Sequence, residues 1–158
     1  MDKFKRQVLI YTDGACSTNG TWKGGWATVV VDGDQKTVFK GSLENTTNNV
    51  MELMAFMMAL RYCGEAAMGN DGIEYLIHSD SAYVLNCFEQ KWYVNWRKNG
   101  WRNAKKEPVA NKELWQTILS YYETLELEGV NIKLVKVKGH SGDRYNEMAD
   151  RLAVEESK

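Results

Sequence analysis

The chain contains few of the residues that mark disulfide-built folds, zinc sites and membrane spans. It has three cysteines and one proline in 158 residues, and no cysteine pair has the CxxC spacing of a zinc site. No apolar run approaches the roughly 18 residues of a membrane-spanning helix, and the charged first residues lack the apolar core of a secretory signal. We therefore expect reduced thiols in a cytoplasmic protein, with a Cys16–Cys63 bridge as the alternative.

The chain also has little net charge. Its formal charge is −1, and its hydrophobic content of 44% and charged content of 26% are ordinary for a globular protein. Total charge therefore does not mark a nucleic-acid binder. The length, without repeats or low-complexity segments, predicts one domain over residues 1–158 with a single core.

Charge is nevertheless unevenly distributed along the chain. Residues 91–112 carry seven basic side chains against one acidic side chain, a net charge of +6, with Trp92, Trp96 and Trp101 between them. Basic groups attract phosphates, and aromatic faces pack on sugars or bases. The segment predicts a nucleic-acid-binding surface. The alternative is a solvated helical face with core tryptophans, Trp96 among them.

The pattern of apolar residues and turn signals predicts an α/β fold. The expected strands cover residues 6–12, 26–31, 36–43, 73–79 and 131–138, and the expected helices cover 48–63, 81–89, 114–125 and a segment from about 143. This order predicts a five-stranded mixed β-sheet with helices on both faces, its first and fourth strands being parallel neighbours. We expect Gly14 in a loop and Asn48 or Asn49 as a helix N-cap.

Four acidic residues occupy positions that a metal-dependent nuclease needs. Asp13 and Asp80 each close an apolar strand, Glu52 lies in an apolar helix, and Asp150 follows His140 by ten positions. Catalytic residues in such folds gather at the carboxyl ends of strands. Cleavage of a phosphodiester by two metal ions needs hard oxygen ligands, which carboxylates supply. We therefore predict that the fold assembles the four carboxylates into one cluster.

Each acidic residue also has a simpler interpretation. Asp13 suits a turn before glycine, Asp80 suits a helix N-cap, and Asp150 suits a solvated helix surface. Glu52 differs, because a carboxylate near a buried helix face is costly unless it is paired or bound to a metal. The residues alone leave these alternatives open.

Four ordered motifs make the chain resemble a known family. They read YTDGAC at 11–16, TTNNVMEL at 46–53, SDSAYV at 79–84 and VKGHSG at 137–142. Asp150 follows the last motif at the spacing that the family has. Together they resemble bacterial-type, type 1 ribonuclease H, over about residues 6–155. The resemblance implies the ribonuclease H-like fold and endonucleolytic cleavage of the RNA strand of RNA/DNA hybrids. It also implies products with 5′-phosphate and 3′-hydroxyl ends. It further implies a monomer that does not bind a membrane and needs no protein partner.

The resemblance further assigns roles to individual residues. Asp13, Glu52, Asp80 and Asp150 correspond to the ligands of two Mg²⁺ ions, with Mn²⁺ as the alternative, and His140 to a loop histidine that assists proton movement or product departure. Thr47 and Asn111 correspond to residues that hold a DNA phosphate, and Asn19, Asn48 and Asn49 to minor-groove or RNA-side contacts. The implied substrate-binding set is Cys16, Asn19, Thr47, Asn48, Asn49, Tyr83, Trp92, Trp96, Lys98, Arg102, Lys105, Lys106 and Asn111.

The chain departs from the family pattern at sites near the substrate. Val50 stands where arginine is common, Asn45 replaces a frequent basic residue, and Ala82 replaces a polar side chain. The loop at 19–25 lacks the family's prolines. These changes affect affinity and cleavage-site preference. Two rival hypotheses are a nuclease or recombinase of this fold that acts on DNA, and a catalytically silent hybrid-binding module.

Overall fold

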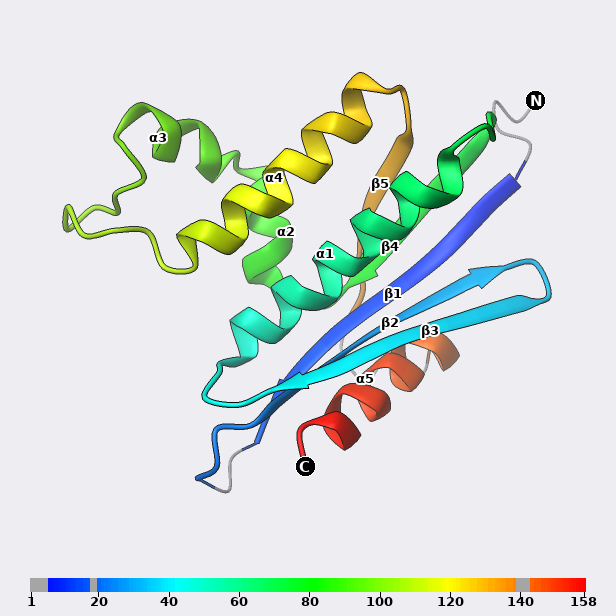
Figure 1. The fold of residues 1–158 in the computed structure, drawn as a ribbon, viewed down its shortest axis with the longest axis horizontal. Helices are drawn as coiled ribbons and strands as arrows, with labels where there is room; N and C mark the ends of the chain where they lie inside the picture. The colour runs from blue at the N-terminus through cyan, green and yellow to red at the C-terminus, as the bar shows by residue number, and fades with distance from the viewer. Residues whose placement is uncertain (1–5, 18–19, 139–142) are drawn as a thin grey trace.

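The central sheet has five strands. The structure is a computed structural model that describes residues 6–17, 20–138 and 143–158. The strand order is β3-β2-β1-β4-β5, with β1 parallel to β4 and antiparallel to β2 (Figure 1). The strands are β1 (Arg6–Cys16), β2 (Gly24–Asp32), β3 (Gln35–Leu43), β4 (Ile73–Ser79) and β5 (Asn131–Lys136). The predicted mixed sheet and its central parallel pair are confirmed.

Helices cover both faces of this sheet. They are α1 (Asn48–Ala67), α2 (Ala82–Glu89), α3 (Trp92–Lys98), α4 (Lys112–Leu127) and α5 (Arg144–Glu156). Val8 and Ile10 of β1 pack in a core with α1 and α4, whereas Tyr11 packs with Ala149 of α5. Because side chains alternate along a strand, these two cores lie on opposite faces. Among the described residues, no helix has both the length and the apolar character to cross a membrane.

Strand β1 extends further than its sequence predicts. Its parallel pairing with β4 ends at Tyr11 opposite His78, but its antiparallel pairing with β2 continues to Cys16 opposite Gly24. The expected end at residue 12 and the expected loop at Gly14 are therefore wrong, because pairing with β2 keeps this segment extended. Beyond Tyr11, β1 runs on past the end of its pairing with β4.

Helix α1 begins one residue earlier than the asparagines suggest. Thr47 is the N-cap, with an extended backbone (φ −131°, ψ 163°) and a side chain that accepts a hydrogen bond from Val50 N at 3.2 Å. The prediction of Asn48 or Asn49 as the cap is wrong, because the Thr47 hydroxyl already satisfies that amide. Both asparagines lie in the first turn and are exposed.

Candidate functional site

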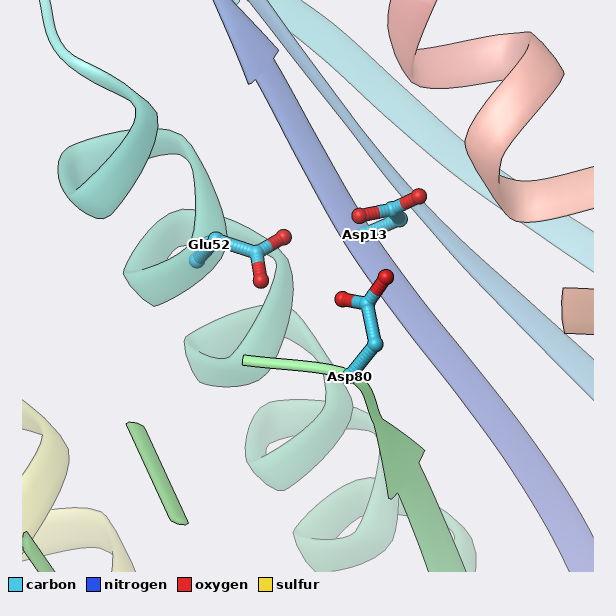
Figure 2. A group of neighbouring side chains, drawn as sticks. All are labelled: Asp13, Glu52 and Asp80. Carbon is cyan, nitrogen blue, oxygen red and sulfur yellow. The ribbon is translucent and has the colours of Figure 1, made fainter. Parts of the chain in front are cut away.

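Three of the predicted carboxylates converge where β1 extends past β4. Asp13 comes from β1, Asp80 directly follows β4, and Glu52 reaches across from α1 (Figure 2). Each offers one oxygen atom, and these atoms lie within 4.8 Å of one another. Residues separated by up to 67 positions in the sequence therefore form one group of hard oxygen donors that could hold a metal ion.

Gly14 permits the close approach of α1 to β1. A Cβ atom at this position would lie 2.4 Å from the backbone nitrogen of Glu52 and 2.5 Å from the carbonyl carbon of Met51. These are distances that real Cβ contacts do not reach, so only glycine fits beneath the helix. The Asp-Gly pair thus combines a carboxylate with the space that lets a second carboxylate approach it.

The start of α2 leaves Asp80 outside the helix cap. Ser81 is the N-cap of α2, and its hydroxyl accepts a hydrogen bond from Val84 N at 3.2 Å. Ser79 also contributes, because its hydroxyl accepts a hydrogen bond from Ser81 N at 3.1 Å. The capping role considered for Asp80 therefore belongs to Ser81.

Burial and mutual repulsion raise the pKa values of the carboxyl groups. The pKa of Asp13 is raised to about 7, and burial is the main cause. The nearby Asp80 and Asp150 also raise this pKa, whereas a hydrogen bond with Glu52 lowers it. Burial, the charge of Asp13 and the hydrogen bond to Asp13 raise the pKa of Glu52 well above its usual value. Without a cation, the cluster therefore holds protons more tightly than isolated carboxyl groups do.

One oxygen of Glu52 is buried without a hydrogen-bond partner. Glu52 is 8% exposed, and its Oε1 atom has no partner among the described residues. A buried oxygen without a partner costs free energy unless another group satisfies it. A divalent cation would satisfy it, so these residues fit the metal that the motifs imply.

Asp150 approaches the same cluster from the other face of the sheet. It lies in α5 and is half-buried, and both a side-chain hydrogen bond and its charge raise the pKa of Asp13. Helix α5 begins at Asp143, whose carboxylate accepts hydrogen bonds from Tyr145 N and Asn146 N at 3.0 Å. His140 and Asn19 lie outside the described residues.

Comparison with known proteins agrees with this geometry. A family model described as RNase H matches residues 5–158. The chain belongs to the ribonuclease H family. It is 43% identical over 148 residues to the ribonuclease H of Syntrophomonas wolfei, covering 94% of each chain. It is also 43% identical over 152 residues to that of Clostridium botulinum strain Hall, covering 95% of each. It is therefore an enzyme of the ribonuclease H class.

Solved structures agree with the family assignment. LC9-RNase H1, a type 1 RNase H with the type 2 active-site motif, superposes with a TM-score of 0.74 at 26% identity, over 96% of this chain and 72% of that one. The foamy viral protease-reverse transcriptase in complex with RNA/DNA hybrid superposes with a TM-score of 0.73 at 26% identity, over 98% of this chain and 20% of that one. Both likenesses extend over almost the whole of this ribonuclease H.

Residues predicted to contact substrate lie around the start of α1. Cys16 ends β1, and its Sγ donates a hydrogen bond to the carbonyl oxygen of Thr46 at 3.5 Å. Thr47 follows directly as the helix cap, and Asn48 and Asn49 form the exposed first turn. The β1 end and the α1 start are therefore joined on the side of the ribonuclease H fold that carries Asp13 and Glu52.

A second group of predicted contacts lies between α2 and α4. The Tyr83 hydroxyl accepts hydrogen bonds from Trp115 Nε1 at 2.7 Å and from Asn111 Nδ2 at 3.2 Å. Trp115 is fully buried, whereas Tyr83 and Asn111 are half-buried. No local pattern predicts this link, because Asn111 and Trp115 lie 28 and 32 positions after Tyr83 in the sequence.

The basic segment projects from the body of this ribonuclease H (Figure 1). Lys98, Arg102, Lys105 and Lys106 are all exposed, and Arg102 Nη1 donates a hydrogen bond to the carbonyl of Lys106 at 2.9 Å. Arg97 has a different role, because it forms two hydrogen bonds of 2.7 and 2.8 Å with Glu123 of α4. These four cations thus face solvent, while Arg97 is engaged with α4.

The tryptophans of this segment are only partly available to a ligand. Trp96 contacts Trp92, Trp101 and Trp115, with ring centroids 6.1, 5.5 and 5.9 Å apart respectively. Trp92 and Trp96 are half-buried. The rings therefore anchor the basic segment to the core, which agrees with the core alternative for Trp96, and they keep only part of their surface for a substrate.

Proposed function

We propose that this enzyme cleaves the RNA strand of RNA/DNA hybrids endonucleolytically, with two divalent metal ions held by Asp13, Glu52, Asp80 and Asp150. The observation that carries the proposal is the group of three carboxylates within 4.8 Å, in which a buried Glu52 oxygen has no partner among the described residues. The ribonuclease H family supports the substrate class. A neighbour of this fold at 26% identity was solved with an RNA/DNA hybrid, which supports the same substrate.

Mg²⁺ suits the site because it binds carboxylates and completes its coordination with water and substrate phosphate. When bound, two such ions supply Lewis-acid stabilisation of the phosphate and a water of lowered pKa. In the proposed reaction the oxygen of a water molecule bonds to phosphorus while the bond between phosphorus and the 3′-oxygen breaks. The water releases a proton and the 3′-oxygen takes one up, giving 5′-phosphate and 3′-hydroxyl ends. The four carboxylates offset the charge of the cations and orient them.

The chain's own residues also govern the protons. The pKa of Asp13 is raised to about 7, and the pKa of Glu52 is raised well above its usual value. Both groups must therefore release protons before they ligate a cation. Activity at limiting Mg²⁺ should therefore rise with pH through about 7. We assign His140 the role of assisting proton movement or product departure, in line with its motif.

Substrate recognition is proposed to use three surfaces. Thr47 and Asn111 hold a phosphate of the DNA strand, and Asn48, Asn49 and Asn19 contact the shallow minor groove, where amide groups meet base edges and 2′-hydroxyls. Cys16 and Tyr83 line this surface. The basic residues Lys98, Arg102, Lys105 and Lys106, with Trp92 and Trp96, grip the DNA backbone. Such contacts read strand type and shape, so we expect little sequence preference.

We further propose that residues 1–158 act as one catalytic domain whose protrusion spans about residues 91–112. The enzyme is proposed to act as a monomer in the cytoplasm. The even distribution of motifs from Asp13 to Asp150 supports the single domain.

A strand-labelled hybrid tests the function directly. We expect Mg²⁺-dependent cleavage of the RNA strand, no cleavage of the DNA strand, and none of RNA or DNA duplexes. EDTA should abolish the activity, and a comparison of Mg²⁺ with Mn²⁺ would establish the preferred ion. Cleavage of the DNA duplex instead would favour the DNA-acting rival, and hybrid binding without cleavage would favour the silent module.

A further inference from the structure

Trp22 is an exposed aromatic residue that the fold does not explain. It is 62% exposed, whereas Trp26 is 9% exposed, Trp115 is fully buried, and Trp92, Trp96 and Trp101 are half-buried. It lies in the loop between β1 and β2, where the family pattern has a proline-rich sequence. A single exposed aromatic residue is common on protein surfaces, so exposure alone indicates nothing.

The backbone of Trp22 is also strained. Its φ angle is +55°, in the left-handed region that glycine and asparagine enter readily and bulky side chains rarely do. Such strain is concentrated at functional sites. A glycine or asparagine here would remove the strain and the exposed apolar surface together, so the fold gains nothing from tryptophan.

One backbone hydrogen bond ties Trp22 to the segment before α1, and a second ties Lys23 to the residue after β1. The carbonyl of Trp22 accepts a hydrogen bond from Thr46 N at 3.0 Å, and Ser17 N donates to the carbonyl of Lys23 at 2.8 Å. Thr46 directly precedes Thr47, the proposed phosphate contact. The segment at 20–23, before β2, accordingly lies close to the segment that leads into α1 (Figure 1). The ring is therefore carried by a tethered backbone, adjacent to the proposed substrate surface.

The charge next to Trp22 is engaged elsewhere. Lys23 Nζ donates a hydrogen bond to the carbonyl of Lys158 at 2.8 Å, so the loop's cation is directed to the chain's C-terminal end. Among the described residues of this loop, Trp22 presents an exposed indole to a ligand. Indole faces pack on sugars and bases with little sequence preference, which suits a hybrid-binding surface.

We propose that Trp22 packs against a sugar or base of the DNA strand, next to the phosphate held at Thr47, and so extends the substrate surface beyond the family's usual contacts. This inference rests on the proposed function. It assigns the loop at 19–25, which departs from the family pattern, a binding role of its own. The hydrogen bond between Trp22 and Thr46 couples the position of the ring to that of the phosphate contact.

The test uses Trp22→Asn and Trp22→Phe in the full chain. Asparagine accepts the left-handed backbone but removes the ring, so its melting temperature should equal or exceed that of the parent. Its dissociation constant for an RNA/DNA hybrid, measured by anisotropy in EDTA, should rise roughly 5- to 100-fold, as expected for the loss of one stacked base. Trp22→Phe keeps a ring and should lose less affinity. Quenching of tryptophan emission by the hybrid should be weaker in Trp22→Phe than in the parent.

Leu127→Ala is the matched control, since Leu127 is 90% exposed at the far end of α4. It should bind the hybrid as the parent does. Equal affinity of Trp22→Asn and the parent would overturn the inference, and so would equal losses in Trp22→Asn and Trp22→Phe. A parent protein that neither binds nor cleaves the hybrid would instead overturn the proposed function, which separates the two failures.

Discussion

The Tyr83 hydroxyl accepts a hydrogen bond from Asn111 Nδ2 at 3.2 Å, and this bond ties α2 to the start of α4. Helix α2 follows Asp80 directly, whereas Asn111 is a proposed phosphate contact. The same hydroxyl accepts a shorter bond of 2.7 Å from the buried Trp115. Tyr83, three residues after Asp80, therefore links α2 to a proposed substrate contact and to the buried Trp115.

Tyr83→Phe should separate this positioning from packing. The ring stays, but Trp115 Nε1 loses its partner, which should cost about 1–3 kcal/mol of folding free energy. Without the bond that orients Asn111, KM for the hybrid should rise several-fold with little change in kcat. In an Asn111→Ala background, the same change should leave KM nearly unaltered. Tyr121→Phe, on the partly exposed face of α4, is the control. An additive effect on KM would contradict the link.

Gly14→Ala should disturb the site through the backbone. The added Cβ would lie 2.4 Å from Glu52 N, so α1 must move away from β1 and carry Glu52 with it. We expect about 1–3 kcal/mol of destabilisation in urea unfolding, as for overpacked cores, and a larger relative loss of activity. Gly64→Ala in α1 is the control without a clash, because its added Cβ would meet only Cδ2 of Leu125 in α4, at 3.4 Å. It should stabilise the helix by roughly 0.5–1 kcal/mol. Destabilisation of the same size in both variants would contradict the account.

Asp13→Asn should remove a loss of folding stability that the parent shows as pH rises. The raised pKa, about 7 against 3.8, means that the folded protein holds a proton that the unfolded chain releases between these pH values. Stability without metal therefore falls as pH rises through this window, by an amount on the order of a few kcal/mol. In EDTA, Asp13→Asn should be more stable than the parent at pH 8 and similar at pH 4. Asp34→Asn, an exposed change, should follow the parent. A parallel pH profile for Asp13→Asn would refute the shift.

Much of this fold follows from local signals. The expected strands at 36–43 and 73–79 and the expected helix at 81–89 lie within one residue of the bounds of β3, β4 and α2, because apolar patterns and turn signals in nearby residues specify these elements. The end of β1 could not be predicted this way, since it depends on pairing with β2 rather than on residues 13–16 themselves. The cap of α1 was ambiguous because Thr47, Asn48 and Asn49 are all good caps, and only the backbone geometry selects Thr47.

The sequence identifies the residues of the site, but not the contacts that bring them together. The apolar neighbours of Glu52 predicted a buried carboxylate that needs a pairing group or a metal, and Glu52 is 8% exposed in the structure. Asp150 carried almost no local signal, because its relation to Asp13 exists only once α5 packs on the sheet. The fit of Gly14 beneath α1 and the strain at Trp22 are likewise products of three-dimensional contact.

The double variant Lys105→Ala and Lys106→Ala tests the basic segment. Both lysines are exposed, so folding should be unaffected. The slope of log Kd for the hybrid against log salt should fall by about 1–2, since each phosphate contact contributes roughly 0.7–0.9. Lys36→Ala, in β3, is the control. An unchanged slope would show that the segment does not meet the phosphate backbone.

The central claim is that the carboxylate cluster performs the chemistry on a bound hybrid. The most direct measurement compares Asp80→Asn with the parent on a hybrid labelled in its RNA strand, with cleavage in Mg²⁺ and binding in EDTA measured on the same protein. We predict that Asp80→Asn loses nearly all cleavage while its dissociation constant stays within a few-fold of the parent's. Cleavage by purified Asp80→Asn at the parental rate would contradict the assignment of the site.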